Sequence, residues 1–315
     1  MKAAVMRGTQ QFAIEDIPTP EPGPNQVLIK IRYSAICGSD VHRFQYGMAN
    51  SGSVLGHEYI GEVVQTGQDV TRLKEGDRIV GGGGTPPVGM QGTVSAGERY
   101  SARTVGVEAT RIGGFAEYVT MDEWRPLMIP DGVSDELAVL SEPASIAVHA
   151  IRNSKFKIGD SAVVMGAGPI GLLTMQVLNA GGASAVYVSE PAPARAEAAR
   201  VLGATLVIDP VNEDAVARVL ELSGGPGVPI AFDAAAAKQT FQQGLEMVRR
   251  NGQLLLISMA WEDVDLQTVD WIGREVEMKA SYGSAPNDWQ TVLNLMERGQ
   301  LSEKSMITDD SFIGW

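Results

Sequence analysis

Ser161-Ala-Val-Val-Met-Gly166-Ala-Gly-Pro-Ile-Gly171 is the stretch of this 315-residue chain that decides the fold of its second half. Residues 161–165 form a short apolar run, which is typical of a strand buried in a parallel sheet. Three glycines follow with the spacing G-x-G-x-x-G, and residues 170–180 then show the apolar pattern of a helix. The stretch predicts a strand, a tight turn and a helix, the first unit of a doubly wound α/β domain.

The same glycines indicate a turn that binds a dinucleotide. Gly166 permits a sharp turn, Gly168 permits a pyrophosphate to approach the helix N-terminus, and Gly171 permits close packing of the helix on the strand. Glu190 ends the next apolar run about 20 residues further on, where such sites place the partner of the adenosine ribose. A carboxylate there repels a 2′-phosphate, so NAD is favoured over NADP, although Arg195 one turn later leaves that choice open. The predicted cofactor-binding residues are Gly166, Gly168, Pro169, Ile170, Gly171, Glu190 and Arg195.

Strand and helix patterns alternate through the rest of the second half. Further apolar runs of strand length lie at 185–189, 205–208, 229–233, 253–258 and 276–281. Helical patterns such as 194–202, 213–224 and 238–250 separate them. With 161–165 this makes six strands, which fits a complete Rossmann domain with a six-stranded parallel sheet.

The first half has a different pattern. Residues 26–34 alternate between apolar and polar positions, and short β-branched runs fill 60–80, as expected of a β-rich, barrel-like domain. Residues 81–114 are rich in glycine and predict a long loop. We place the β-rich domain at 1–146 and 284–315, and the Rossmann domain at 147–283.

Composition limits the partners of the chain. Its net charge of -13 argues against nucleic acid or an anionic membrane as a partner, since both would repel it. No run of 18 apolar residues occurs, and the start of the chain is too short in apolar length for a secretory signal. A single cysteine cannot form an internal disulfide. A cytoplasmic protein is expected.

That cysteine and two of the three histidines lie close together in the sequence. Cys37 and His42 occur in Cys37-Gly-Ser-Asp-Val-His42, and His57 and Glu58 occur in Gly56-His57-Glu58. A thiolate, an imidazole and a carboxylate together suit a tetrahedral zinc that keeps one position open for chemistry. The pattern predicts a catalytic metal site. His149, in an apolar helical stretch, is instead predicted to be a packing residue.

Several motifs in order make the chain resemble the zinc-dependent medium-chain dehydrogenases of the sorbitol and threonine dehydrogenase type. They are Cys37 to His42, Gly56-His57-Glu58, Gly76-Asp-Arg-Ile-Val80, Gly113-Gly-Phe-Ala-Glu-Tyr118, Glu142-Pro143 and Gly166 to Gly171. The resemblance covers nearly the whole chain. It implies a GroES-like catalytic domain joined to the Rossmann domain, one catalytic zinc, NAD, and a homo-oligomer, either dimer or tetramer.

The resemblance also implies roles for particular residues. Cys37 and His57 are expected to bind zinc, with Glu58 as a third ligand that exchanges with water or substrate. Glu142 is the competing carboxylate, expected either as the third ligand itself or as a catalytic residue that hydrogen-bonds the zinc-bound water, in which case Glu58 lies behind the ligands. Asp40 is expected to orient the His57 imidazole, because zinc-bound histidines usually donate their second N–H to an oxygen.

The substrate side of the site is predicted in the same way. Ser39 is expected to touch the substrate hydroxyl and to pass its proton to His42, although His42 could equally be a surface or nucleotide-contacting residue. Tyr46, Phe115, Arg274 and Tyr282 correspond to positions that border the substrate cleft in polyol-active relatives. For the aromatic residues, packing is an equal alternative; for Arg274, oxygen partners on a sugar or polyol are expected.

Two departures from the family pattern qualify the resemblance. The chain lacks the four closely spaced cysteines that bind a second, structural zinc in many relatives. Relatives also continue beyond the equivalent of Trp315, which suggests an incomplete chain. The sequence predicts hydride transfer from a secondary alcohol, such as a polyol or sugar, to NAD, giving a ketone. Alternatives are a zinc-free NADPH-dependent reductase of the same fold and an inactive nucleotide-binding scaffold.

Overall fold

The computed structural model describes residues 1–85, 113–260 and 263–307, and these form two compact units. The first unit contains Met1–Ser145 and Gly283–Glu297, and the second contains Ile146–Tyr282 and the described residues after Arg298. Residues 302–306 contact the second unit because the Gln176 amide bonds the backbone of Ser302, at 2.8 and 3.2 Å. The domain bounds expected from the sequence placed this segment in the first domain instead. No helix in the described ranges is long and apolar enough to cross a membrane.

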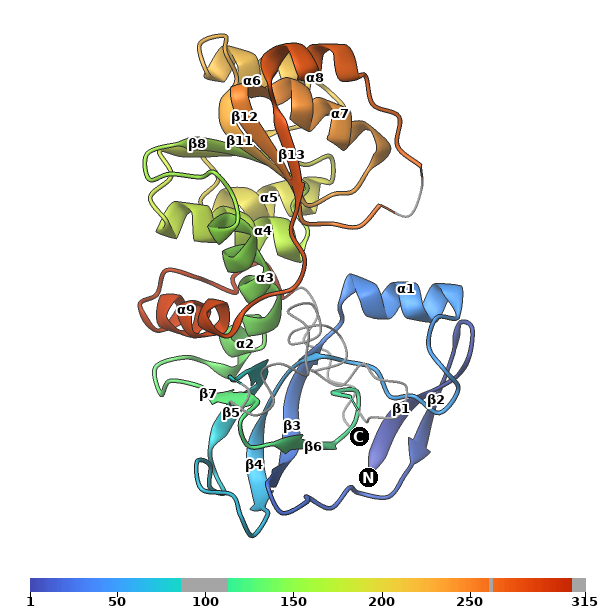
Figure 1. The fold of residues 1–315 in the computed structure, drawn as a ribbon. Helices are drawn as coiled ribbons and strands as arrows, with labels where there is room; N and C mark the ends of the chain where they lie inside the picture. The colour runs from blue at the N-terminus through green and yellow to red at the C-terminus, as the bar shows by residue number, and fades with distance from the viewer. Residues whose placement is uncertain (86–112, 261–262, 308–315) are drawn as a thin grey trace. The chain divides into compact units, whose positions relative to one another are not determined.

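The second unit is built on a six-stranded parallel sheet (Figure 1). Its strands are β8 (Ser161–Met165), β9 (Ala185–Ser189), β10 (Leu206–Ile208), β11 (Val228–Asp233), β12 (Val248–Leu256) and β13 (Glu277–Ala280). The order β10-β9-β8-β11-β12-β13 is that of a doubly wound sheet, so the fold predicted from the glycine turn and the apolar runs is confirmed. The strand order reverses between β8 and β11, where such sheets bind ligands.

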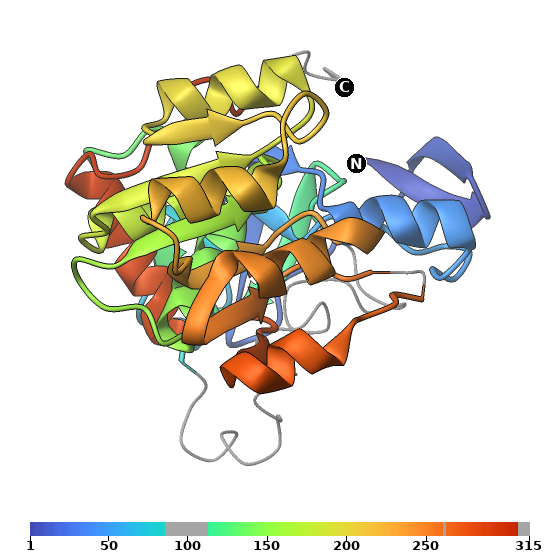
Figure 2. The ribbon, with the colours of Figure 1, turned by 90° about the horizontal axis from the view of Figure 1, so that it is seen from above.

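Helices cover both faces of this sheet (Figure 2). They are α3 (Ser141–Arg152), α4 (Pro169–Ala180), α5 (Pro193–Val201), α6 (Ala215–Leu222), α7 (Lys238–Met247) and α8 (Thr268–Arg274). Alternate strand residues form two separate cores, as the period of two requires. Val164 and Phe232 pack with α3, α4 and α5, whereas Met165 and Ala231 pack with α6, α7 and α8.

The first unit is mainly antiparallel β-structure. A five-stranded sheet has the order β6-β3-β4-β5-β7, and a two-stranded sheet pairs β1 with β2. The strands are β1 (Lys2–Gly8), β2 (Gln11–Asp16), β3 (Gln26–Ala35), β4 (Glu58–Thr66), β5 (Arg78–Gly83), β6 (Tyr118–Asp122) and β7 (Pro126–Met128). The predicted alternation in 26–34 is confirmed, with Val27 and Ile29 fully buried and Lys30 exposed.

Three helices lie in the described part of this unit besides the start of α3. They are α1 (Gly38–Tyr46), α2 (Asp135–Ala138) and α9 (Pro286–Glu297). Helix α9 contacts α2 and β5, and Figure 1 shows it beside the start of α3.

The predicted loop at 81–114 is only partly open to comparison, because 86–112 lie outside the described residues. Its first residues, however, are buried strand rather than loop, since β5 extends to Gly83. The glycines serve packing there. A Cβ on Gly81 would lie 2.5 Å from the Tyr59 ring, and one on Gly83 would lie 2.6 Å from Cβ of Trp289.

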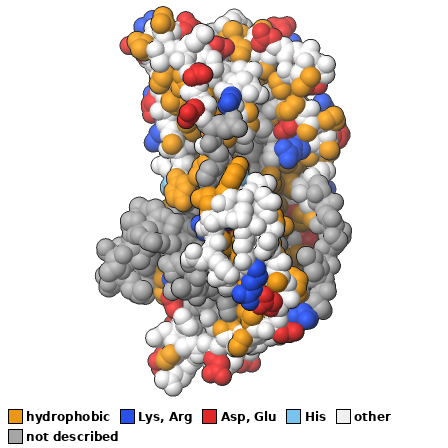
Figure 3. Space-filling model, turned by 90° about the vertical axis from the view of Figure 1, so that its right-hand side faces the viewer, with side chains coloured by type: hydrophobic (Ala, Val, Ile, Leu, Met, Phe, Trp, Pro, Cys, Tyr) orange, Lys and Arg blue, Asp and Glu red, His pale blue; other side chains and the backbone are white. Residues whose placement is uncertain are grey.

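The surface mixes both signs of charge. On the face that Figure 3 presents, Asp and Glu side chains are interspersed with Lys and Arg rather than gathered in one patch. Several pairs bridge elements of the first unit, such as Arg78 to Asp135 at 2.5 Å, which joins β5 to the first turn of α2.

Candidate functional site

Cys37 stands between strand β3 and helix α1. Its extended backbone (φ -74°, ψ 151°) makes it the N-cap of α1, and its sulfur accepts a bond from the Ser39 N–H at 3.5 Å. The Asp40 carboxylate reaches back to the Cys37 N–H at 3.2 Å, which completes a capping box. The partial positive charge of a helix N-terminus favours a negatively charged ligand atom at this place.

Glu58 is the first residue of β4, which pairs with β3 in antiparallel register, and His57 directly precedes it. Gly56 turns the chain into this strand with φ 92°, and a Cβ there would lie 2.7 Å from the Phe115 ring. Because Ala35 pairs with Glu58, the end of β3 and the start of β4 lie side by side. The sheet register thus brings Cys37 to His57 and Glu58 across a gap in the sequence.

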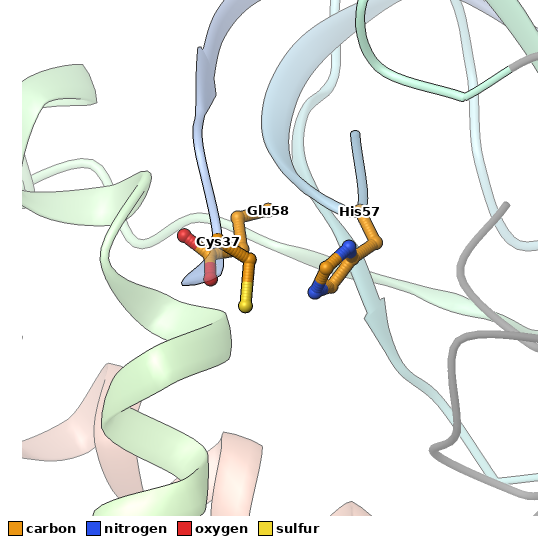
Figure 4. A group of neighbouring side chains, drawn as sticks. All are labelled: Cys37, His57 and Glu58. Carbon is orange, nitrogen blue, oxygen red and sulfur yellow. The ribbon is translucent and has the colours of Figure 1, made fainter. Parts of the chain in front are cut away.

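These three side chains converge on one point (Figure 4). One ligand atom from each of Cys37, His57 and Glu58 lies within 4.8 Å of the others. His57 and Glu58 are both 6% exposed, so neither is freely hydrated. A thiolate, an imidazole and a carboxylate at this separation are the donor set expected of a zinc site with an open position.

The electrostatics of the cluster favour a cation. Burial opposes a charge on His57, but Asp40, Cys37 and Glu142 outweigh it and raise the pKa of His57 to about 11. Burial, reinforced by the charge of Glu58 and opposed by His57, raises the pKa of Glu142 to about 8. Burial also raises the pKa of Glu58. Three buried carboxylates around one imidazole are therefore short of positive charge.

A test of the fit to zinc comes from unpartnered atoms. His57 Nδ1 and Asp40 Oδ1 are both buried without a hydrogen-bond partner in the described part of the chain, and they face each other at 3.6 Å. This is the arrangement in which Nδ1 points to a carboxylate and Nε2 remains for a metal. The predicted pairing of Asp40 with His57 is present, and the residues fit the metal.

The other predicted residues of the first unit lie on α1 and near β4. Ser39 and His42 are one turn apart on α1, and the His42 ring stacks on Tyr46 with centroids 6.0 Å apart. Tyr46 is 61% exposed. Phe115 packs at Gly56, as the packing alternative expected. Their contacts with substrate and the proton relay stay predictions.

The glycine turn of the second unit has the geometry that its motif predicts. Gly166 has φ 90°, Gly168 is the N-cap of α4 with open space where a side chain would lie, and Pro169 is in the first turn. A Cβ on Gly171 would lie 1.9 Å from the Gly166 carbonyl oxygen, so only glycine permits this packing. Ile170 lies in the same first turn of α4.

Glu190 closes the turn from the neighbouring strand. It follows β9, is 4% exposed, and accepts hydrogen bonds from the N–H groups of Ala167 at 2.7 Å and Ala192 at 2.8 Å. The carboxylate therefore fixes the glycine turn itself, a contact that sequence reasoning missed. Arg195 is exposed on α5. The contact of Glu190 with ribose stays a prediction.

The Arg274 guanidinium is hydrogen-bonded to the protein backbone, whereas the sequence predicted oxygen partners on a substrate. The guanidinium donates to carbonyl oxygens at the end of α7, at 2.6 Å to Val248 and 2.8 Å to Leu245. It therefore caps that helix. Tyr282 is 63% exposed, and His149 of α3 bonds Asn153, which directly follows that helix, at 2.8 Å.

Sequence reasoning also missed Asp233, which ends β11 at the point where the strand order reverses. The residue is 0% exposed, and Oδ1 accepts from the N–H groups of Ala235 and Ala236 and from the Thr240 hydroxyl. Burial raises its pKa. The sequence does show an acidic residue at the end of an apolar strand run. Only the strand order, however, places that residue where the order reverses.

Comparison with known proteins gives two family matches. Residues 169–298 match the model of the zinc-binding dehydrogenases, and residues 23–131 match that of the alcohol dehydrogenase GroES-like domain. (R,R)-butanediol dehydrogenase of Bacillus subtilis (strain 168) is 34% identical over 325 residues, which cover 98% of this chain and 91% of that protein. Sorbitol dehydrogenase of the same organism is 31% identical, over 98% of this chain and 89% of that protein.

The fold is shared with solved structures as well. A zinc-binding dehydrogenase structure from Sinorhizobium meliloti 1021, bound to NADP, superposes with a TM-score of 0.85 and 27% identity, over 96% of this chain and 89% of that one. The GroES-like match includes the donor cluster of the first unit, and the match to the zinc-binding dehydrogenases begins at Pro169, within the glycine turn of the second. The chain belongs to the zinc-dependent medium-chain alcohol dehydrogenase family.

Proposed function

We propose that this enzyme uses zinc and NAD to oxidise a secondary alcohol, such as a polyol, a diol or a related sugar derivative, to a ketone. The observation that carries the proposal is the convergence of Cys37, His57 and Glu58 within 4.8 Å in a buried setting. The similarity to butanediol and sorbitol dehydrogenases supports a small polar alcohol as substrate.

Cys37, His57 and Glu58 would hold the metal, with Glu142 as the further carboxylate that faces it. When bound there, zinc supplies Lewis-acid polarisation of the alcohol oxygen. Asp40 fixes the orientation of the His57 ring and keeps its second nitrogen directed inward. The burial of these groups strengthens their electrostatic interactions, because water is excluded.

Proton transfer is assigned to helix α1. The alcohol loses a proton as well as a hydride, so a route to solvent is required. Ser39 lies two residues beyond the ligand Cys37, and His42 lies one turn along the same helix next to the exposed Tyr46. We assign the proton to the Ser39 hydroxyl first and then to the His42 imidazole, because histidine is the side chain that most often carries protons in catalysis.

The second unit would bind the dinucleotide, which would supply the hydride acceptor. The N-terminus of α4 and the open space at Gly168 suit a pyrophosphate. Glu190, held by two backbone N–H groups, presents a negative charge that opposes a 2′-phosphate, which supports NAD over NADP. A homo-oligomer and a cytoplasmic location remain part of the proposal.

The test is a coupled measurement of coenzyme reduction, followed by absorbance, with a panel of alcohols. The panel contains 2,3-butanediol, sorbitol, xylitol, threonine, 2-propanol and 1-propanol, each with NAD and with NADP. We expect NADH formation with one or more of the secondary alcohols, its loss after treatment with a zinc chelator, and its return on adding zinc. Turnover that survives chelation, or that requires NADPH and an activated double bond, would contradict the proposal.

A further inference from the structure

Two buried serines flank Glu142 in the first turns of α3. Ser141 is 1% exposed and its hydroxyl lies 3.7 Å from the sulfur of Met296, and Ser145 is 0% exposed and its Oγ lies 2.9 Å from Oγ of Ser284. Residues four apart share one face of a helix, and Glu142 is turned by about 100° from Ser141 and by about 60° from Ser145. The two serines are therefore fixed against the segment that carries α9, and Glu142 lies beside them on the helix surface.

A chain of hydrogen bonds runs from α9 to the backbone of Glu142. The Trp289 indole N–H donates to Ser284 Oγ at 2.9 Å, and the Ser145 hydroxyl donates to the Glu142 carbonyl oxygen at 2.7 Å. An indole only donates, and each serine has one proton. The bond between the two hydroxyls is therefore donated by Ser284, so every donor in the chain has an acceptor.

This chain of hydrogen bonds lies against the sheet whose strand β4 begins with Glu58. Trp289 is 2% exposed and lies against Gly83 of β5, where any Cβ would come within 2.6 Å of Cβ of Trp289. Strand β5 pairs with β4, whose first residue is Glu58. Glu58 of the donor cluster and Glu142, whose charge interacts with it, are thus both tied to β4 and β5, Glu58 through its own strand and Glu142 through Trp289.

Glu142 is a residue for which small displacements matter. It is 9% exposed, and its carboxylate interacts with the charges of Glu58, His57 and Asp40. A carboxylate in such a cluster acts only if its distance from the cation is held within a few tenths of an ångström. The hydrogen bond from Ser145 fixes the turn of backbone from which that carboxylate extends.

We propose that Trp289, Ser284 and Ser145 are positioning residues that set the Glu142 carboxylate against the Cys37, His57 and Glu58 cluster. The proposal rests on the proposed zinc site. The chain of bonds acts through Glu142 and does not itself touch substrate or metal.

The experiment uses the full chain with cobalt(II) in place of zinc, because cobalt(II) reports its ligands in the visible absorption spectrum. The variants are Ser284→Ala, Ser145→Ala and Trp289→Phe, the last of which keeps an aromatic ring and removes the N–H. We expect each to change the cobalt absorption bands and to speed cobalt loss to a chelator by about tenfold. Trp289→Phe carries the test if an alanine variant does not fold.

The matched control is Thr291→Val on the same helix. The Thr291 hydroxyl donates to the Asn287 carbonyl oxygen of α9 itself, at 2.7 Å, and has no place in the chain to Glu142. Thr291→Val removes a hydroxyl-to-carbonyl bond of the same kind as that from Ser145 to Glu142, but from within α9, the helix that carries Trp289. The spectrum and the cobalt loss rate are expected to match those of the unmodified protein.

A double-variant cycle separates positioning from general stability. If the chain of hydrogen bonds acts through Glu142, then Ser284→Ala should add no further acceleration of cobalt loss in a protein that already carries Glu142→Gln. The full acceleration in that background would overturn the proposal, and so would cobalt spectra unchanged in all three single variants. An unmodified chain that binds neither zinc nor cobalt would contradict the proposed function itself, and the positioning role with it.

Discussion

Oδ1 of Asp40 lies 3.6 Å from Nδ1 of His57, and both atoms are buried without a hydrogen-bond partner in the described residues. Asp40 also accepts the Cys37 N–H through its other oxygen, so one carboxylate holds two of the three donors of the cluster. The capping box of α1 is thus part of the proposed metal site as well as of the helix.

Replacing Asp40 with asparagine should weaken zinc binding by about 10-fold to 100-fold, because the acceptor that orients the imidazole loses its charge. A competition titration against a coloured chelator measures this. Asp209→Asn is a suitable control, since Asp209 is a carboxylate outside the cluster that likewise accepts a backbone N–H, that of Val211 at 2.9 Å. An Asp40→Asn variant with unchanged zinc affinity would show that the 3.6 Å approach has no role in binding.

Zinc binding should become tighter as the pH rises from about 6 to about 9. In the metal-free protein the pKa of His57 is raised to about 11, so the ring carries a proton at neutral pH that a metal must displace. The raised pKa stabilises the metal-free fold fully below the ordinary pKa of histidine, and this stabilisation is lost as the pH rises towards about 11. Zinc therefore competes with protons for His57, and the concentration of free protons falls as the pH rises.

Calorimetry in buffers of different ionisation enthalpy measures the protons released. We expect at least about one per zinc at neutral pH, with His57 as a source. Binding that releases none, and that is independent of pH over this range, would contradict the raised pKa of His57.

Gly171→Ala should disrupt the second unit. The added Cβ would lie 1.9 Å from the Gly166 carbonyl oxygen, which forces apart the strand and helix that form the dinucleotide turn. We expect the free energy of unfolding to fall by about 1–3 kcal/mol and NAD affinity to fall with it. Urea unfolding and fluorescence titration with NADH provide the two numbers.

Gly273→Ala on α8 is the control for that substitution, because a Cβ added there would have nothing within 4 Å. There the same change should be neutral or slightly stabilising, by about 0.5–1 kcal/mol. Equal effects at the two positions would argue against the close packing of Gly171.

Arg274 offers a test between two uses of one side chain. If its contacts with the α7 carbonyls define its role, Arg274→Met should lower the melting temperature by several degrees and leave KM for the alcohol unchanged. If it binds substrate, as expected from the sequence, KM should rise about tenfold or more. Thermal unfolding and initial-rate kinetics on the same preparation decide between them.

The parts of the fold that sequence could predict are those fixed by local pattern. Short apolar runs indicated the strands of the parallel sheet, and the glycine spacing placed the turn between β8 and α4, because both depend on neighbouring residues. The bounds differ by a few residues, as in β12, which begins at Val248 rather than at 253.

The features that sequence could not predict depend on contacts between distant segments. Gly81 and Gly83 were expected to open a loop, yet they lie in β5. Glycine is needed there because Tyr59 and Trp289 fill the space that a Cβ on Gly81 or Gly83 would occupy. Nothing in the sequence joins Ser145 to Ser284, and a lone arginine near a helix end gave no sign that it would cap α7. These contacts follow from the strand order and from the return of α9 to the first unit.

The most direct test of the account is the zinc content of the purified chain and of its Cys37→Ser variant, measured by mass spectrometry together with NADH binding. We predict about one zinc per chain in the unmodified protein. Cys37→Ser should lose zinc and alcohol oxidation and keep NADH affinity nearly unchanged, because Cys37 lies in the first unit and the dinucleotide turn in the second. A chain without zinc, or a Cys37→Ser variant that keeps zinc and turnover, would contradict the central claim.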